Sequence, residues 1–279
     1  MMITYRRTGR AAVRAAAGVF GFLLAACGAI ASAQQVGDVV RVNEKIALQV
    51  GTTLGEEIHT GSTYVVGAVN GDWLWIKAGK EGWIPRSKVS LVEGAGAHYA
   101  KLTPEQQKAV AATWRRGAKL TFSDQSEVLV VDLSGCDVSK AEVFAELKPL
   151  ASMIQEFGLR LSSVNDDSLA GIAEFTNLTA LSLGGNPITD KSLTPISKLT
   201  KLRSLGLMAT PVTDAAMEQV AKLTNLEELR LTVTGVSDAG LAKLTTLKKL
   251  KVLEVTLTNV SFVGAQEFEK KVPGVKVTR

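Results

Sequence analysis

The stretch that decides the fold is Leu226–Leu241, which reads LEELRLTVTGVSDAGL. Leu178–Leu193 reads LTALSLGGNPITDKSL and repeats both the leucine spacing and the Thr/Ser-Asp pair. Related segments start at Ile154, Leu202 and Leu250, so the five starts fall at a strict interval of 24 residues. Self-similarity at a fixed interval of this length indicates a solenoid, in which each repeat buries an apolar face against the next.

A degenerate sixth copy precedes these five. It starts at Val128, 26 residues before Ile154, and places Cys136 at the ninth position of the repeat. The other copies hold small polar residues at that position: Ser162, Asn186, Thr210, Thr234 and Thr258. Apolar residues at the first, fourth and sixth positions predict a short parallel strand, and Val275–Val277 is expected as a final edge strand. The Thr/Ser-Asp pair predicts a helix cap followed by a favourable negative charge.

The pattern L-x-x-L-x-L-x-x-(N/T)-x-(V/I)-(T/S)-D-x-x-L resembles that of leucine-rich repeats, particularly the short kind that carries T-D-x-x-L after the strand. The resemblance covers residues 128–279, just over half of the chain. It implies an α/β solenoid of six repeats, with one parallel strand and one helix in each 24-residue repeat. In this family a buried Asn or Cys at the ninth position ties the turning backbone to its neighbour, and hydroxyl groups can act similarly.

Residues 34–96 have a different sequence pattern from the repeats. Five short apolar stretches recur between turn signals, and Asn70-Gly71 is a strong hairpin signal. The series resembles bacterial SH3-like domains, which implies a small all-β barrel. Trp73 and Trp75 share one face of a strand, and Trp83 follows in the next stretch. Two interpretations stay open for them: packing, in the barrel core or against the neighbouring module, or an aromatic surface for a peptide or glycan.

Residues 97–127 are expected to form a helix and a strand that cap the solenoid at its N-terminal end. Thr103, Pro104 and Gln106 have the spacing of an N-cap, a first helical position and the far residue of a capping box. A cap is required because the terminal apolar face of a solenoid would otherwise meet water.

Residues 1–33 are interpreted as a signal peptide. Four arginines precede an apolar run, and Ala31–Ala33 offers a small-residue cleavage site. Leu24–Cys27 resembles a bacterial lipobox, in which Cys27 would be the lipidated residue. An uncleaved anchor is the third alternative, since the run barely reaches the length that spans a bilayer. We therefore expect an exported chain, periplasmic or extracellular, with no membrane span after cleavage and with a lipid anchor at Cys27 as one alternative.

The charge balance argues against a nucleic-acid partner. The chain has 32 basic and 27 acidic residues, and residues 1–33 contain four of the basic residues and none of the acidic ones. The remaining 28 basic and 27 acidic residues leave a net charge near +1. Binding to nucleic acid normally needs a basic patch or stripe.

No catalytic, metal or cofactor site is expected. The two histidines, His59 and His98, have no cysteine or carboxylate constellation beside them, and motifs for phosphate, nucleophile or metal chemistry are absent from the sequence. Cys136 is interpreted as a buried small residue in preference to a reactive thiol. The repeated aspartates suggest a row of cation ligands, but their place at helix starts favours a structural role. They are Asp166, Asp190, Asp214 and Asp238.

The outward strand positions, the third, fifth and seventh of each repeat, define the concave face of the solenoid. Small residues occupy its centre and charged residues its two ends. The candidate partner-binding residues are Asp132, Arg160, Ser182, Met208, Glu228, Arg230 and Glu254. The leading hypothesis is a non-enzymatic scaffold of the bacterial cell envelope that binds a protein partner on this face. Two alternatives are a cell-wall adaptor that binds peptidoglycan or glycan through Trp73, Trp75 and Trp83, and an accessory or inhibitory subunit of a secreted enzyme.

Overall fold

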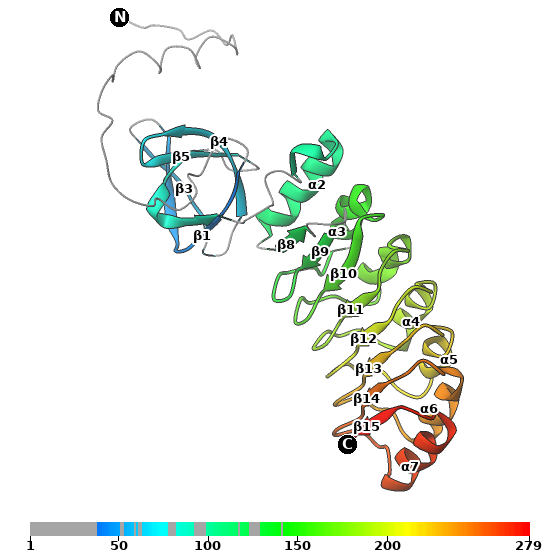
Figure 1. Ribbon diagram of the computed structural model, residues 1–279. Coiled ribbons are helices and arrows are strands. Elements are labelled where there is room, and N and C mark those ends of the chain that lie inside the picture. The colour runs from blue at the N-terminus through cyan, green and yellow to red at the C-terminus, as the bar shows by residue number, and fades with distance from the viewer. Residues whose placement is uncertain are drawn as a thin grey trace, which may run out of the picture. The chain divides into compact units, whose positions relative to one another are not determined.

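The computed structural model describes residues 38–50, 53–58, 60, 63–77, 82–91, 99–116, 118–122, 129–140 and 142–279. The expected signal peptide with Cys27, and the two histidines His59 and His98, lie outside the described residues. The described strands form one seven-stranded sheet and one eight-stranded sheet (Figure 1).

The N-terminal sheet is antiparallel, with strand order β3-β2-β6-β5-β4-β1-β7. Its strands are β1 Val39–Val42, β2 Ile46–Val50, β3 Thr53–Ile58, β4 Thr63–Asn70, β5 Trp73–Lys77, β6 Gly82–Pro85 and β7 Val89–Leu91. A short 3-10 helix, η2 Arg86–Lys88, precedes β7. The sheet has its own core, which includes Leu74, Ile76 and Ile84, each 0% exposed. An antiparallel sheet of short strands is compatible with an SH3-like fold.

The hairpin between β4 and β5 falls one residue later than expected. Asn70 pairs with Trp73, so the two loop residues are Gly71 and Asp72. Gly71 alone has a positive φ, +56°, whereas the expected Asn-Gly turn needs a positive φ at both residues. Glycine at the first loop position is typical of a type II′ turn, which also matches the twist of the flanking strands.

The eight-stranded sheet runs in chain order from β8 to β15, and every pairing from β9 onward is parallel. Its strands are β8 Lys119–Phe122, β9 Leu129–Asp132, β10 Ile154–Gly158, β11 Ala180–Ser182, β12 Ser204–Gly206, β13 Glu228–Arg230, β14 Val252–Glu254 and β15 Lys276–Thr278. Leu181, Leu205 and Leu229 are in register, so identical buried side chains stack from coil to coil. The predicted solenoid of parallel strands is confirmed.

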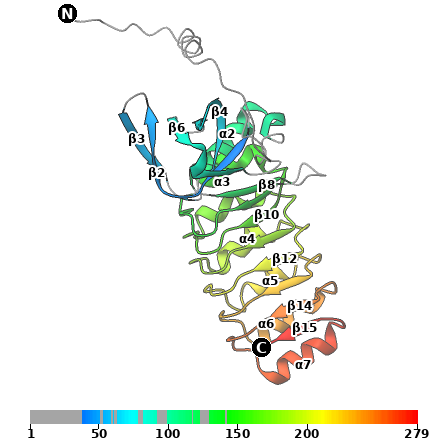
Figure 2. The same cartoon turned by 60° about the vertical axis from the view of Figure 1, so that its left-hand side comes forward.

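Short helices connect each strand of the solenoid to the next and lie on one side of the strands (Figures 1 and 2). They are α3 Glu142–Leu147, η3 Lys148–Leu150, η4 Ser168–Glu174, η5 Asp190–Ser192, α4 Leu193–Ile196, α5 Met217–Val220, α6 Asp238–Lys243, η6 Leu244–Thr246 and α7 Phe262–Lys271. Several are 3-10 turns where α-helices were expected. A 3-10 turn covers more length per residue, which suits a coil that must close within 24 residues.

Helix α2, Pro104–Arg115, and strand β8 precede the first coil. Thr103 donates its backbone N–H to Gln106 Oε1 at 3.0 Å, and the Gln106 N–H donates to Thr103 Oγ1 at 3.3 Å. These two bonds form the predicted capping box. Val110 of this helix is fully buried in the solenoid core, and β8 pairs antiparallel with β9. Both elements therefore cover the first coil.

Asn186, at the ninth repeat position, joins two coils. Its Oδ1 accepts hydrogen bonds from the backbone N–H groups of Ser162, at 3.0 Å, and Val164, at 3.1 Å. Its Nδ2 donates to the carbonyl oxygens of Leu159, at 2.5 Å, and Leu183, at 2.7 Å. The residue is 2% exposed, so this one amide satisfies four backbone groups away from water.

The hydroxyls at the same position in other coils act differently from the expectation. Thr210 Oγ1 donates to Leu207 O and Thr234 Oγ1 to Leu231 O, each at 2.7 Å. Both acceptors lie three residues earlier in the same coil. A hydroxyl reaches its own turn but not the neighbouring coil, because it is shorter than a carboxamide and has a single donor.

Candidate functional site

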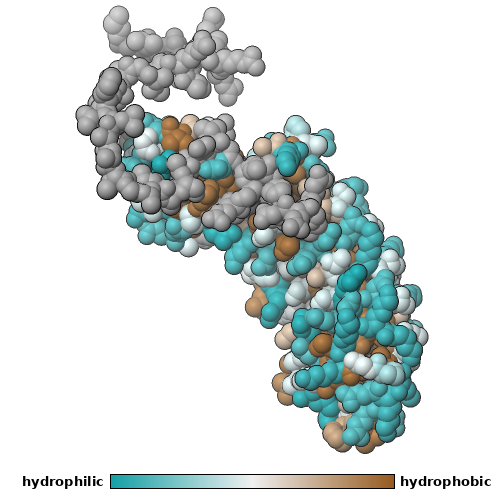
Figure 3. Space-filling view, in the orientation of Figure 1, coloured by the Kyte–Doolittle hydropathy of each residue, from teal (hydrophilic) through white to brown (hydrophobic). Residues whose placement is uncertain are grey.

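The concave face consists of the strand side chains that point away from the helices. Its central coils carry Ala180, Ser182, Ser204 and Gly206, none of which rises far above the backbone. Figure 3 shows one side of the solenoid coloured by hydropathy. Hydrophilic residues dominate that side, and separate apolar patches lie toward the C-terminal end. The larger polar side chains lie at the two ends of the face, as the sequence predicts.

Three of the predicted partner-binding residues, Asp132, Arg160 and Ser182, line one shallow hollow at the N-terminal end of this face. We call it the N-terminal hollow. Its volume is about 300 Å³, and Glu156 and Gly158 also line it. A Cβ atom on Gly158 would lie 2.6 Å from Asp132 Oδ1, so the glycine lets this carboxylate lie across the neighbouring coil. Asp132 Oδ1 also accepts the backbone N–H of Ser134, at 2.9 Å.

Arg160 is the cation of the N-terminal hollow. Its backbone N–H donates to Ser134 Oγ at 3.2 Å. Its Nε lies 3.8 Å from the place that a Cβ atom of Gly184 would occupy, so the side chain extends over the next coil. Within the described part of the chain, the Arg160 guanidinium and the Glu156 carboxylate form no ion pair or hydrogen bond. The hollow therefore presents uncompensated charges of both signs. Met208 lies beside Gly184 on the following coil and is half-buried.

The other predicted charges, Glu228, Arg230 and Glu254, form a separate cluster toward the C-terminal end. Arg230 Nη2 lies 3.0 Å from Glu228 Oε2, and Arg230 Nε lies 3.2 Å from Glu254 Oε1. The charges of these three side chains are therefore paired with one another. Pairs of this exposure contribute at most about 1 kcal/mol to stability. The predicted partner-binding residues therefore form two separate regions. Of their two arginines, Arg230 is paired and Arg160, in the N-terminal hollow, is not paired with any described residue.

An apolar ridge, which the sequence did not reveal, follows the strand ends. The residue after the last concave position has a left-handed backbone in every coil from Gly135 onward, with φ between +52° and +76°. Four of these residues are not glycine, and we define them as the apolar ridge: Leu161, Ala209, Val233 and Leu257. Leu161 is 70% exposed and Leu257 is 77% exposed. A left-handed residue with a side chain costs roughly 1–2 kcal/mol, so exposed apolar side chains here are not explained by stability.

The repeated aspartates connect successive coils. Asp190 accepts the backbone N–H and the hydroxyl of Thr213, both at 2.7 Å, and Asp214 binds Ser237 in the same way. Asp166 and Asp238 make the equivalent bonds to Thr189 and Ser261. Each carboxylate therefore holds the helix cap of the next coil. The structural interpretation of these aspartates is supported, although the bonds reach beyond their own helices.

Small residues in the next coil make room for these carboxylates. A Cβ atom on Gly240 would collide with Asp214 Oδ1, and one on Gly264 would collide with Asp238 Oδ1. Ser192 occupies the equivalent place in an earlier coil and donates its hydroxyl to Asp166 Oδ1 at 2.5 Å. The aspartate in one coil thus restricts the residue 26 positions later to a small side chain.

We call the hydrogen bonds from one aspartate to the helix cap of the next coil an aspartate staple. The staple at Asp166 predicts a loss of stability in acid. Burial raises the pKa of this carboxyl, but hydrogen bonds from Ser192 and Thr189 outweigh burial and lower it. The unfolded chain, with the higher pKa, then binds more protons as the pH falls. The stabilisation is complete above the unfolded pKa, about 3.9, and is lost as the pH falls through the folded pKa.

We expect Asp166→Asn to lower the free energy of unfolding by about 1 kcal/mol at neutral pH, with the difference shrinking below about pH 4. Urea unfolding at several pH values measures this. Asp167→Asn is the matched control, because Asp167 is exposed and its side chain makes no cap hydrogen bond. If the difference in the free energy of unfolding between Asp166→Asn and the native chain stayed constant into acid, the stabilising role of the Asp166 carboxylate would be contradicted.

Cys136 is half-buried against the solenoid core. Burial and the negative charge of Asp132 raise the pKa of its thiol. A raised pKa lowers the fraction of thiolate, which is the reactive form. This agrees with the structural interpretation of the cysteine.

The three predicted tryptophans of the N-terminal sheet share its outer face. Leu74 and Ile76, on the opposite face of β5, fill the core, whereas Trp73 is 38% exposed and Trp75 is half-buried. The interpretation that these tryptophans fill the core is wrong, because aliphatic residues already occupy that side of the strand. Trp75 and Trp83 pack edge to face, with ring centroids 5.4 Å apart. Trp73 and Trp83 line a hollow together with Gln49 and Asn70.

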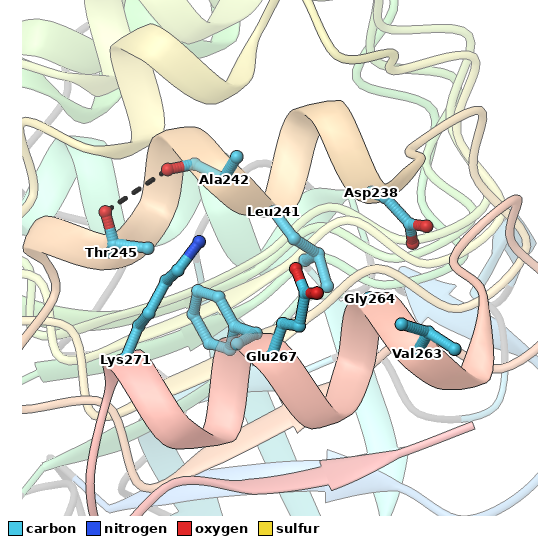
Figure 4. A pocket seen from close by; sticks show the side chains of 9 residues that line it. Asp238, Leu241, Ala242, Thr245, Val263, Gly264, Glu267 and Lys271 are labelled. Atoms are coloured by element: carbon cyan, nitrogen blue, oxygen red, sulfur yellow. Dashed lines mark hydrogen bonds between the residues drawn. The ribbon is translucent and has the colours of Figure 1, made fainter.

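A second groove of the solenoid lies between α6 and α7 (Figure 4). Asp238 lines it, but both oxygens of that carboxylate already accept hydrogen bonds from Ser261. Glu267 and Lys271 also line it and carry opposite charges one helical turn apart. The Thr245 hydroxyl donates to the Ala242 carbonyl oxygen at 3.2 Å. The groove is the seam between two coils and offers no set of unpaired groups that converge on a ligand.

In the described residues, no three histidine, cysteine, aspartate or glutamate side chains gather as metal ligands would. No helix in this part of the chain is both long enough and apolar enough to cross a membrane.

Comparison with known proteins supports the repeat architecture. A family model described as leucine-rich repeat matches residues 176–197, which include β11 and η5. The chain matches none of the curated proteins with which it was compared. The in-register parallel strands show a repeat solenoid, and one stretch of it matches the leucine-rich-repeat model.

Among solved structures, the chain is similar to internalin C2 from Listeria monocytogenes, with 25% identity over 53% of this chain and 59% of that chain, at a TM-score of 0.44. An internalin from the same species is 18% identical over 47% of this chain and 43% of its own, at a TM-score of 0.35. A leucine-rich-repeat protein from Leptospira interrogans is 15% identical over 64% and 52%, at a TM-score of 0.39. This chain spans less than two thirds of each of these proteins.

Proposed function

We propose that the chain is a non-enzymatic scaffold of the bacterial cell envelope that binds a protein partner on the concave face, centred on the N-terminal hollow. The observation that carries this proposal is the Arg160 guanidinium, which extends over small residues of the next coil and is unpaired within the described part of the chain. Glu156, likewise unpaired there, lines the same hollow. Uncompensated charges of both signs on a preformed surface select a partner of complementary charge pattern.

The openness of the face favours a protein over a small molecule. Small-molecule sites enclose most of the surface of their ligand, whereas this hollow is shallow and continues into an open sheet. A protein contact needs roughly 800 Å² on each partner, which only an extended surface supplies. The mixture of charges on the face disfavours nucleic acid, which needs a basic surface.

The apolar ridge supplies the second component of such an interface. It follows the last outward strand position, so it borders the concave face along the coils. Leu161 is the residue next to Arg160, which places an exposed apolar side chain beside the unpaired cation. Apolar anchors beside oriented charges are typical of protein interfaces. Every parallel strand from β9 to β14 is bonded on both sides, so little backbone order is lost on binding.

Charge reversal at Arg160 tests this proposal. The native full chain, Arg160→Glu and Lys198→Glu would each be immobilised and exposed to envelope extract from the source cells. Lys198 is an exposed cation just after α4, and among the described residues its ammonium group forms no ion pair, so its reversal changes the net charge equally on the helical side. We expect the native chain and Lys198→Glu to retain the same protein, and Arg160→Glu to retain at least about tenfold less.

All three chains should melt at nearly the same temperature, because both side chains are exposed and neither forms an ion pair among the described residues. Equal retention by Arg160→Glu and the native chain would remove the N-terminal hollow from the interface. Retention that both reversals abolish would indicate a nonspecific effect of net charge.

A further inference from the structure

The outer face of the N-terminal sheet carries two rows of directly opposed residues. One row crosses five strands as Leu54, Gln49, Trp83, Trp75 and Ala68. The adjoining row is Asn70, Trp73 and Pro85. Directly opposed residues of antiparallel strands point to the same side, so these eight residues form one surface. We call it the tryptophan platform.

The platform leaves a large apolar area in water. Leu54 is 79% exposed and Trp73 is 38% exposed, although the described core residues of this sheet are all aliphatic apart from Tyr64. Burying an indole is among the largest gains available to a small domain, so three indoles on the outer face are not explained by folding. Exposed apolar surface rimmed by polar groups is typical of a binding site.

We propose that the tryptophan platform binds a neutral oligosaccharide. The hollow at its centre is lined by two indoles, Trp73 and Trp83, and two carboxamides, Gln49 and Asn70. None of these lining residues is charged. The flat C–H face of a sugar ring packs on an indole, and the hydroxyls at its edge both donate and accept hydrogen bonds. The Asn70 carboxamide also offers both donors and an acceptor, so it matches such a hydroxyl.

A proline-rich peptide is the competing occupant, and the lining fits it less well. Proline has no backbone N–H, so such a peptide presents mainly carbonyl acceptors. The N–H groups of the indoles and of the Asn70 carboxamide would serve those acceptors, but Asn70 Oδ1 would be left without a donor. A hydroxyl-bearing ligand satisfies both kinds of group.

The platform has the length of an oligosaccharide. Five adjacent strands, about 4.8 Å apart, extend the first row over roughly 19 Å. Trp75 supports the ring of Trp83 through an edge-to-face contact at 5.4 Å, which fixes one stacking surface in place. Because the described lining residues are uncharged, binding should change little with salt. The platform belongs to a different sheet from the concave face, so this proposal is independent of the proposed function.

The test is a titration of the full chain with cellotetraose and with chitotetraose, followed by tryptophan fluorescence and calorimetry. We expect saturable binding of at least one of these neutral tetrasaccharides, unchanged by about a tenfold rise in salt concentration. Trp73→Ala and, separately, Asn70→Ala should each weaken it by about tenfold or more. Leu257→Ala, which removes an exposed apolar side chain of the ridge, is the matched control and should bind as the native chain does.

Three results would overturn the proposal. The first is no binding of either neutral tetrasaccharide by the native chain at millimolar concentration. The second is binding that Trp73→Ala and Asn70→Ala both leave unchanged while melting as the native chain does. The third is binding of a proline-rich decapeptide, abolished by Trp73→Ala, without sugar binding, which would assign the platform to peptides. Each result leaves the retention experiment with Arg160→Glu unaffected.

Discussion

Replacing Asn186 by alanine is expected to lower the free energy of unfolding by about 3 kcal/mol or more. The amide satisfies two backbone N–H groups and two carbonyl oxygens that are buried between coils. Alanine leaves three of the four without a partner, because Leu159 O still accepts the hydroxyl of Ser162 at 2.5 Å. Each unsatisfied buried group costs roughly 1–3 kcal/mol before the coils relax. Urea unfolding followed by circular dichroism measures the change.

Thr210→Val is the matched control, one coil further along. It removes a single hydroxyl that bonds only to Leu207 of its own coil, so a loss of about 1 kcal/mol is expected. Equal losses for the two variants would contradict the conclusion that Asn186 joins neighbouring coils while threonine does not.

Phe157→Ala is expected to lower the free energy of unfolding by about 3–5 kcal/mol. Phe157 lies on β10 and is 2% exposed. Its ring centroid is 5.9 Å from that of Phe144 and 5.6 Å from that of Phe175, and the latter two are 6.1 Å apart. The three rings fill the core of the less regular N-terminal coils, where other coils stack leucines. Removing one of the three rings leaves a cavity that rigid neighbours cannot fill.

Phe262→Ala is the control for this substitution. Phe262 begins α7 and is 63% exposed, so its removal should change stability by less than about 0.5 kcal/mol. A loss below about 1 kcal/mol for Phe157→Ala would show that the N-terminal coils repack freely, contrary to the packed core described here.

The repeat architecture was predictable because it depends on periodicity. Leucines at a fixed interval determine which side chains face inward and bring equivalent residues of successive coils into register. The same register would have revealed the pairing of Arg230, since Glu254 lies 24 residues later and Glu228 two residues earlier. The aspartate staples also leave a signal, because each aspartate is followed 23 residues later by a threonine or serine. That signal is visible only when successive repeats are compared.

Other features were not available from the sequence. A spacing of two places Trp73 and Trp75 on one side of a strand but does not say which side is the core. Leu74 and Ile76 decide that question only when β5 is placed in its sheet. The apolar ridge depends on backbone dihedral angles, and Leu257 or Val233 would not be chosen for a left-handed position on propensity. An outward strand position likewise predicts exposure, but not that Arg160 is left unpaired.

Site-specific photo-crosslinking tests the central claim, that the concave face binds a protein, most directly. A photoreactive amino acid at Ser182, on the wall of the N-terminal hollow, would be activated in the full chain mixed with envelope extract of the source cells. We predict a discrete protein adduct from position 182 that disappears in the Arg160→Glu background. The same group at Lys198, on the helical side, should yield none. Equal adducts at both positions, or none at 182 while 198 reacts, would contradict the account.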